Sequence, residues 1–120
     1  AAKAVQYVLN QRGITSTMLT RKSGPNNYDA LTAEDFKKHK LWINCTPLGG
    51  PDLTDVHLPV PDGVLSPEFA IFDLIYNPLP TPLLQAAIDA EARSVDGRIM
   101  LTEQAKKAWN LFRAAYYKNL

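Results

Sequence analysis

Residues 69–84 read Phe-Ala-Ile-Phe-Asp-Leu-Ile-Tyr-Asn-Pro-Leu-Pro-Thr-Pro-Leu-Leu, and this stretch decides the fold class. Its first part, Phe69–Ile75, is apolar except for Asp73, which is typical of a strand. Its last part begins a helix, because Thr81 is a good N-cap residue and Pro82 fits the first helical position. A strand followed by a helix is the unit from which parallel sheets covered by helices are built.

The alternation of helix and strand continues outward from this stretch in both directions. Apolar residues at helical spacing, short β-branched or apolar runs, and helix-ending residues such as Gly13 mark the other elements. The order that we predict is helix 1–12, strand 14–19, helix 33–39, strand 41–43, strand 69–75, the helix from Pro82, strand 93–95 and helix 100–117. This alternation predicts an α/β fold in which helices flank a parallel sheet.

Three of the predicted helices carry an apolar face, which we expect to be buried. The residues of these faces are Ala1, Ala4, Val5, Val8 and Leu9 in the first helix, Leu83, Leu84, Ala87 and Ile88 in the third, and Leu101, Ala105, Ala108, Leu111, Phe112 and Ala115 in the last. Gln104 interrupts the last of these faces. A buried amide needs several hydrogen-bond partners, so Gln104 is either satisfied by neighbouring backbone or directed at a polar ligand.

The composition fits one small globular domain and excludes several classes of partner. The 120 residues carry 13 Lys and Arg against 12 Asp and Glu, and a net charge of +1 gives no electrostatic case for nucleic acid or an anionic membrane. A single cysteine excludes an internal disulfide framework and fits a reducing, cytoplasmic compartment. No apolar run approaches the roughly 20 residues that span a bilayer. His39 and His57 lack the spacing of metal ligands, so we predict surface positions for both and no metal site.

Sheets of this kind bind ligands at the carboxyl ends of their strands, so the loops that begin there form the candidate site. These loops begin at Thr20, Asn44, Asp73 and Asp96. The loop at Thr20 follows the first predicted strand, and in a dinucleotide-binding unit an acid at this position binds the ribose hydroxyls of NAD, whereas a cation accepts the 2′-phosphate of NADP. The sequence at this position is Arg21-Lys22 with no acid, which suits a phosphate, although two solvated surface cations are the alternative.

The other loops each leave two interpretations open. Asn44-Cys45-Thr46-Pro47-Leu48-Gly49-Gly50 suits either a backbone that approaches a ligand or a plain turn. Cys45 has no suitable histidine partner in the sequence, so a packing thiol is favoured over a nucleophile. Asp73 must find hydrogen-bond partners inside its apolar strand. Tyr76 either presents its hydroxyl to a ligand or is an aromatic residue at the rim of the site.

Together these loops resemble one protein family, the shikimate dehydrogenases. Ile43–Gly49 resembles the family's Asn-x-Thr-Pro-x-Gly motif, Phe72–Pro78 with Thr81–Leu84 resembles a family strand and its following helix, and Asp96-Gly97-x-x-Met100-Leu101-x-x-Gln104-Ala105 resembles the family's C-terminal signature. Ala1–Val5 resembles the helix that follows the family's glycine-rich turn. The resemblance covers essentially the whole chain, with the motifs in the right order and spacing.

The resemblance implies that residues 1–120 are a single Rossmann-like NADP-binding domain, incomplete at its N-terminus because the family's first strand and glycine-rich turn would precede Ala1. It implies an oxidoreductase that reduces 3-dehydroshikimate to shikimate with NADPH, in the biosynthesis of chorismate and aromatic amino acids. The family's catalytic Lys and Asp belong to an N-terminal substrate domain, and no Lys or Asp of this chain matches them. We therefore predict no catalytic residue in this chain and expect it to be inactive alone.

The resemblance also assigns individual contacts. The cofactor-binding positions are Thr20, Arg21 and Lys22 around the 2′-phosphate and adenine ribose, Thr46, Pro47 and Leu48 beside the cofactor, and Leu74 and Gly97 at the nicotinamide. The positions that would contact the shikimate or 3-dehydroshikimate substrate are Tyr76 and Gln104. Three positions depart from the family pattern: Thr20 replaces a frequent Asn, Gly50 a frequent Met and Ile99 a frequent Gly. The last two changes alter the position in which the nicotinamide ring is expected to bind.

Two other functions are compatible with these motifs. The first is a quinate/shikimate dehydrogenase that prefers NAD, against which the acid-free Arg21-Lys22 pair argues. The second is a non-catalytic α/β binding domain of the same fold, against which Tyr76 and Gln104 argue. A sheet without its first strand would expose unpaired edges and apolar surface, so we also expect self-association, such as a homodimer through the exposed sheet edge.

Overall fold

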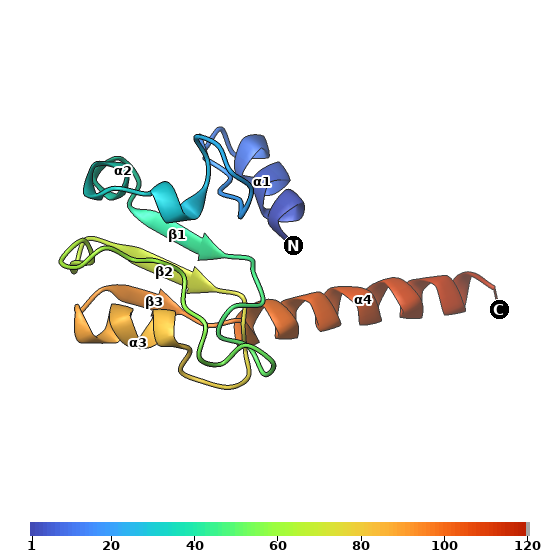
Figure 1. The fold of residues 1–120 in the computed structure, drawn as a ribbon. Coiled ribbons are helices and arrows are strands. Elements are labelled where there is room, and N and C mark those ends of the chain that lie inside the picture. The colour runs from blue at the N-terminus through green and yellow to red at the C-terminus, as the bar shows by residue number, and fades with distance from the viewer. Residues whose placement is uncertain (120) are drawn as a thin grey trace.

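The computed structural model describes residues 1–119 and follows the predicted order of elements, except that residues 14–19 form no strand and residues 28–30 form a 3-10 helix that was not predicted. The elements are α1 (Ala2–Gln11), the 3-10 helix η1 (Tyr28–Ala30), α2 (Ala33–Lys38), β1 (Leu41–Asn44), β2 (Ala70–Asp73), α3 (Pro82–Asp89), β3 (Arg93–Val95) and α4 (Arg98–Lys118) (Figure 1).

The three strands form one parallel sheet in the order β1-β2-β3, which confirms the predicted α/β arrangement. The middle strand is β2, in which Ala70 is aligned with Leu41 on one side and with Arg93 on the other. The strands run in the same direction, so their carboxyl ends meet at one edge of the sheet. At that edge Asn44 and Asp73 are register partners.

The helix α3 covers the sheet and begins as predicted. Thr81 Oγ1 accepts a hydrogen bond from the Leu84 amide at 3.2 Å, and proline occupies the first turn. Leu83, Leu84 and Ala87 are buried against the sheet, and full burial of a leucine contributes about 1.5–3 kcal/mol to stability. Ile88 is 52% exposed, so its predicted burial is wrong. At about 100° per residue, Ile88 stands at the margin of the face that the other three residues form.

An aromatic cluster fixes α2 against the sheet. Phe36 is the buried residue of α2, and its ring centroid lies 5.1 Å from that of Trp42 in β1 and 5.7 Å from that of Phe69 before β2. Such aromatic pairs each add about 0.5–1.5 kcal/mol beyond the area they bury. This short helix is therefore held mainly by one side chain.

Residues 14–19 do not form the predicted strand. Thr15–Leu19 makes no backbone hydrogen bond with any other residue that the structure describes, and the nearest bridge is an isolated one between Thr20 and Asn27. A strand requires a neighbouring backbone about 4.8 Å away. Residues 14–19 instead line a cavity that also borders β1, so their β-branched sequence has no partner to pair with.

The predicted apolar faces of α1 and α4 are not buried. Neither helix contains a buried residue: Val5, Leu9 and Ala108 are half-buried, and Ala1, Ala4, Val8, Leu101, Ala105, Leu111, Phe112 and Ala115 are exposed. The reason for α1 is that it borders the cavity rather than a packed sheet. The reason for α4 is that it leaves the carboxyl edge of the sheet and runs outward (Figure 1), which gives the molecule extents of 58 × 31 × 28 Å.

Candidate functional site at the carboxyl edge of the sheet

A buried polar network joins the ends of β1 and β2 to the start of α3. Asn44, Asp73 and Thr81 are 1%, 0% and 1% exposed. Asp73 Oδ1 accepts hydrogen bonds from Asn44 Nδ2 at 3.0 Å and from the Ile75 amide at 3.1 Å, while Asp73 Oδ2 accepts one from Thr81 Oγ1 at 2.6 Å. Asp73 therefore has the partners that its position in an apolar strand requires, and the penalty of burying a carboxyl group unpaired is avoided.

The loop after β1 is built on the side chain of Asn44. Asn44 Oδ1 accepts hydrogen bonds from the Thr46 amide at 2.9 Å and from Thr46 Oγ1 at 2.7 Å, and Asn44 Nδ2 donates to the Leu48 carbonyl at 3.4 Å. The Leu48 amide donates in turn to Thr46 Oγ1 at 3.2 Å. Gly49 then turns the chain with a φ of 90°, a conformation that favours glycine. One buried amide thus sets the course of the predicted cofactor loop.

Gly97 packs its backbone directly on the end of β2. The Gly97 amide donates to the Ile75 carbonyl at 2.9 Å. A Cβ atom at Gly97 would overlap the carbonyl oxygen of Leu74 and lie 2.5 Å from its carbonyl carbon. Because the φ of Gly97 is an ordinary −71°, this close approach, and not the backbone conformation, requires glycine. The contact fixes the N-terminus of α4 beside the buried Leu74.

An ion pair at the start of α4 was not predicted from the sequence. Asp96 Oδ1 accepts a hydrogen bond from the Arg98 amide at 2.8 Å, and the Arg98 guanidinium lies 2.7 Å from Asp96 Oδ2. The hydrogen bonds from Arg98 hold the pKa of Asp96 below its ordinary value of 3.8. The available signal was the Asp-x-Arg spacing at a helix start, since an acid that precedes a helix can accept from its first amides.

The two predicted phosphate-binding cations lie on a separate loop with a fixed backbone. The Thr20 amide donates to the Asn26 carbonyl at 2.8 Å, and Asn27 Nδ2 donates to the carbonyls of Arg21 and Lys22 at 3.2 and 3.1 Å. Both cationic side chains are exposed, and neither takes part in a salt bridge within residues 1–119. The loop therefore presents two cations from an ordered backbone, which fits an anionic group such as a phosphate.

The two predicted substrate contacts are accessible. Tyr76 follows the end of β2 and is 48% exposed. Gln104 is exposed on α4, so its predicted place in a buried face is wrong, and its side chain forms no hydrogen bond with any other described residue. Both side chains therefore have polar atoms available to a ligand. Thr46, Pro47, Leu48, Leu74 and Gly97 lie with Tyr76 at the carboxyl edge, whereas Thr20, Arg21 and Lys22 lie on their own loop.

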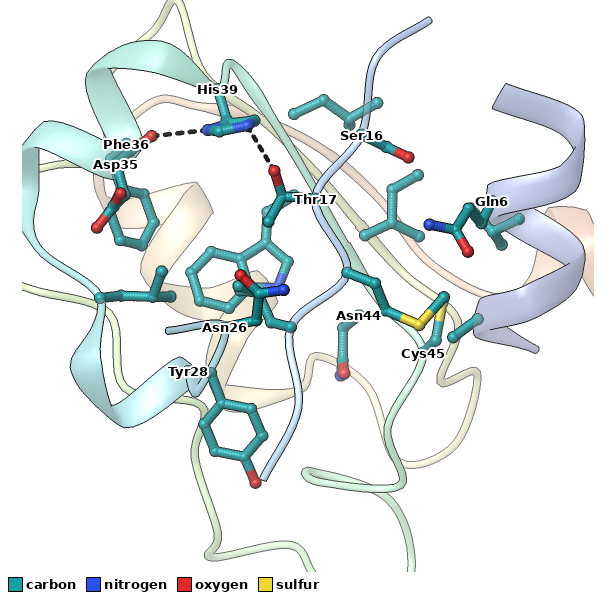
Figure 2. Close-up of a pocket in the computed structure, with 18 of the residues that line it drawn as sticks. Gln6, Ser16, Thr17, Asn26, Tyr28, Asp35, Phe36, His39, Asn44 and Cys45 are labelled. Carbon is teal, nitrogen blue, oxygen red and sulfur yellow. Dashed lines mark hydrogen bonds between the residues drawn. The ribbon is translucent and has the colours of Figure 1, made fainter. Parts of the chain in front are cut away.

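A cavity also lies beside β1, and of the predicted site residues Thr46 lines it. It has a volume of about 540 Å³ and lies between α1, residues 14–19 and Leu41–Thr46 (Figure 2). On its far side His39 Nδ1 lies 3.0 Å from the Asp35 carbonyl, and His39 Nε2 lies 3.3 Å from Thr17 Oγ1. Cys45 also lines it, and burial raises the pKa of the Cys45 thiol, which suits the predicted packing role better than a nucleophilic one.

The residues that the structure describes form neither a metal-binding cluster nor a helix that could span a membrane. Within residues 1–119, no group of three or more His, Cys, Asp or Glu residues is arranged to hold a metal ion. None of the helices that the structure describes combines the length and apolar character needed to cross a membrane.

The chain is similar to curated shikimate dehydrogenases, although no protein-family model matches it. It is 37% identical over 79 residues to the "Shikimate dehydrogenase (NADP(+))" of Pelodictyon phaeoclathratiforme, which covers 66% of this chain and 28% of the relative. It is 32% identical over 128 residues to the enzyme of the same name from Methanocella arvoryzae, which covers 93% of this chain and 46% of the relative.

A solved structure shares the fold. The crystal structure of shikimate 5-dehydrogenase from Listeria monocytogenes, in complex with shikimate and NAD, matches 68% of this chain and 28% of its own with a TM-score of 0.63 and 23% identity. The chain spans less than half the length of the curated relatives given above. On these similarities in sequence and fold, the chain belongs to the shikimate dehydrogenase family.

Proposed function

We propose that this chain is the cofactor-binding part of an NADP-dependent shikimate dehydrogenase, which reduces 3-dehydroshikimate to shikimate. One observation carries the proposal: three motifs that lie far apart in the sequence meet at the carboxyl edge of the sheet. Asn44 of the first motif bonds to Asp73 of the second, and Gly97 of the third bonds to Ile75 of the second. This edge is where doubly wound α/β sheets bind dinucleotides.

The residues of this chain fit NADP in two places. Arg21 and Lys22 would hold the 2′-phosphate together with Thr20, because a planar guanidinium can make paired hydrogen bonds to phosphate oxygens. Thr46–Leu48, Leu74 and Gly97 would hold the nicotinamide half at the sheet edge. The bound cofactor supplies the hydride.

The substrate would meet this chain at Tyr76 and Gln104. Both side chains can donate and accept hydrogen bonds, and both are exposed, so they suit the hydroxyl groups of shikimate. The family resemblance places acid–base catalysis on a Lys and an Asp that no residue of this chain matches. We therefore expect the 120-residue chain alone to show no shikimate oxidation, and measurable turnover by the purified chain would contradict this part of the proposal.

The cavity beside β1 fits a further strand parallel to β1. The carbonyls of Lys40 and Asn44 accept hydrogen bonds from the amides of Ala70 and Leu74. The alternate residues Leu41 and Ile43 therefore direct their amides and carbonyls to the other side, toward the cavity. The unpaired backbone of Thr15–Leu19 lines the cavity as well. An added strand would supply partners to both backbones.

Within residues 1–119 no backbone pairs with the outer edge of β1, and this makes a homodimer part of the proposal, since unpaired edges pair with other chains. Size-exclusion chromatography coupled to light scattering tests this directly, because it measures the molar mass of the chain in solution. A dimer is expected, and a strictly monomeric species of 13.3 kDa at high concentration would contradict self-association.

Cofactor choice is tested by titrating the isotopically labelled chain with NADP+ and with NAD+ in an NMR experiment that detects weak binding. We expect NADP+ to bind more tightly than NAD+, because only NADP+ carries the 2′-phosphate. Arg21→Gln should weaken NADP+ binding roughly tenfold, as expected for loss of a charged hydrogen bond, and leave NAD+ unchanged. Lys107→Gln, at an exposed position of α4, is the matched control. Equal affinity for both dinucleotides, or an Arg21→Gln variant with unchanged NADP+ binding, would refute the phosphate site.

A further inference from the structure

Among the residues that the structure describes, Asn44, Asp73 and Thr81 are the buried polar side chains of an otherwise apolar core. The family resemblance assigns none of them to the cofactor or the substrate, yet they form most of the side-chain hydrogen bonds at the sheet edge. Asn44 alone takes part in four of these bonds, with its oxygen accepting two and its nitrogen donating two. This is the full capacity of an amide group, so its orientation is fixed by its partners.

The network extends beyond strand pairing. Asn44 and Asp73 are already aligned by the backbone ladder, in which the Leu74 amide donates to the Asn44 carbonyl at 3.1 Å. The side-chain bonds instead lead away from the ladder. From Asn44 they lead to the amide and hydroxyl of Thr46 and to the Leu48 carbonyl.

From Asp73 the bonds lead in two other directions. Asp73 Oδ1 holds the Ile75 amide, which fixes the chain as it leaves β2 toward Tyr76. Asp73 Oδ2 holds Thr81 Oγ1, which caps the first turn of α3 through the Leu84 amide. The network therefore ties the loop after β1, the segment after β2 and the start of α3 to one buried carboxyl group.

We propose that Asn44 and Asp73, linked through Thr81 to α3, are positioning residues that hold Thr46–Leu48 and the segment after β2 in the geometry that binds the nicotinamide half of the cofactor. This inference rests on the proposed function. Removing a buried partner leaves the other unpaired, and such a change costs about 1–3 kcal/mol. In a short loop, part of this free-energy cost weakens cofactor binding, because the loop adopts its binding geometry less often.

The first variant is Asn44→Asp, which keeps the shape of the side chain and its acceptor toward Thr46. It replaces the donor toward Asp73 with an oxygen, so two carboxyl oxygens would meet across the present 3.0 Å contact. The double variant Asn44→Asp/Asp73→Asn restores a donor and an acceptor across this contact. The second pair acts at the far end of the network: Thr81→Val removes the hydroxyl that bonds to Asp73, and Thr81→Ser keeps it.

Two ligands distinguish the proposed positioning role of the network from an effect on the proposed phosphate site. NADP+ contains both halves of the cofactor, whereas adenosine 2′,5′-bisphosphate contains only the adenine half and the phosphate that Arg21 and Lys22 would bind. We expect Asn44→Asp and Thr81→Val to weaken NADP+ binding at least fivefold and to leave adenosine 2′,5′-bisphosphate within twofold of the unchanged chain. The double variant and Thr81→Ser should recover most of the NADP+ affinity. Urea unfolding of each variant, measured at the temperature of the binding assay, shows that all compared proteins are folded there.

The outcomes are distinct. Equal weakening of both probes, or failure of Thr81→Ser to retain NADP+ binding, would show a general structural role and overturn the proposal. Unchanged NADP+ binding in Thr81→Val would also overturn it, even where Asn44→Asp fails to fold. If neither probe binds to the unchanged chain, the proposed function fails instead. If the bisphosphate binds and adding the nicotinamide half in NADP+ gives no further affinity, the positioning inference fails alone.

Discussion

The contact between Gly97 and the end of β2 gives a sharp prediction, because the substitution Gly97→Ala adds one carbon atom where the backbone leaves no room. The new Cβ would overlap the Leu74 carbonyl oxygen, lie 2.5 Å from its carbon and lie 3.0 Å from the carbonyl carbon of Ile75. Ordinary contacts of a Cβ atom fall at 3.4–4 Å. The start of α4 must therefore move away from β2 by about 1 Å or the chain at Leu74 must shift.

The magnitude follows from two effects. Overpacking of this kind costs typically 1–3 kcal/mol. The movement also lengthens the 2.9 Å hydrogen bond from the Gly97 amide to the Ile75 carbonyl, which contributes about 1 kcal/mol. We expect Gly97→Ala to lower the free energy of unfolding by about 2–4 kcal/mol, a large part of the 5–15 kcal/mol typical of a small domain.

Urea unfolding followed by tryptophan fluorescence measures this loss, since the half-buried Trp42 packs against the core residue Phe36. The control is Gly63→Ala, at a glycine with a φ of 72° and no atom within 4 Å of the added carbon. That substitution isolates the cost of a left-handed backbone, about 1–2 kcal/mol. A Gly97→Ala variant as stable as the unchanged chain, or one less affected than Gly63→Ala, would refute the close approach.

Three further predictions concern the core, the cavity and α2. Leu84→Ala should destabilise the chain by about 2–5 kcal/mol in the same urea assay, whereas Ile88→Ala, at an exposed position, should cost less than about 1 kcal/mol. Cys45 should react with iodoacetamide more slowly than free cysteine at pH 8, because burial raises the pKa of its thiol and lowers the thiolate fraction; an equal rate would contradict this. An NMR titration of Asp35 should give a midpoint below 3.8, because the amide and hydroxyl of Thr32 bond to its carboxylate. The stability that Asp35 contributes is then present above its unfolded pKa and is lost as the pH falls through its lower folded pKa; a midpoint at or above 3.8 would refute this.

Elements whose signals are local could be predicted from the sequence. The apolar run Phe69–Ile75 contains the central strand, which is shorter (Ala70–Asp73), and Thr81 and Pro82 start α3 where capping chemistry places them. The same holds for Arg93–Val95, which is a strand over the predicted residues. In each of these the residues that decide the structure lie within a few positions of one another.

Elements whose structure depends on distant partners could not be predicted in the same way. Residues 14–19 have the composition of a strand, but pairing requires a backbone on the cavity side, and the described residues place none there. The apolar face of α4 has helical spacing that correctly predicts a helix. Burial of that face needs a surface to pack against, and periodicity carries no information about whether one is near.

The candidate site depends both on local sequence signals and on contacts between distant residues, as Asn44 and Asp73 show. The sequence marks Asn44 and Asp73 as polar residues at two strand ends, but their contact exists only because the two strands align with Asn44 opposite Asp73. A slip of one residue would turn one of the two side chains to the opposite face of the sheet and leave a buried polar group unpaired. The 3.0 Å bond between them therefore also opposes every other register of β1 and β2, so the residues that we propose to hold the cofactor loop add to the alignment of the strands beneath it.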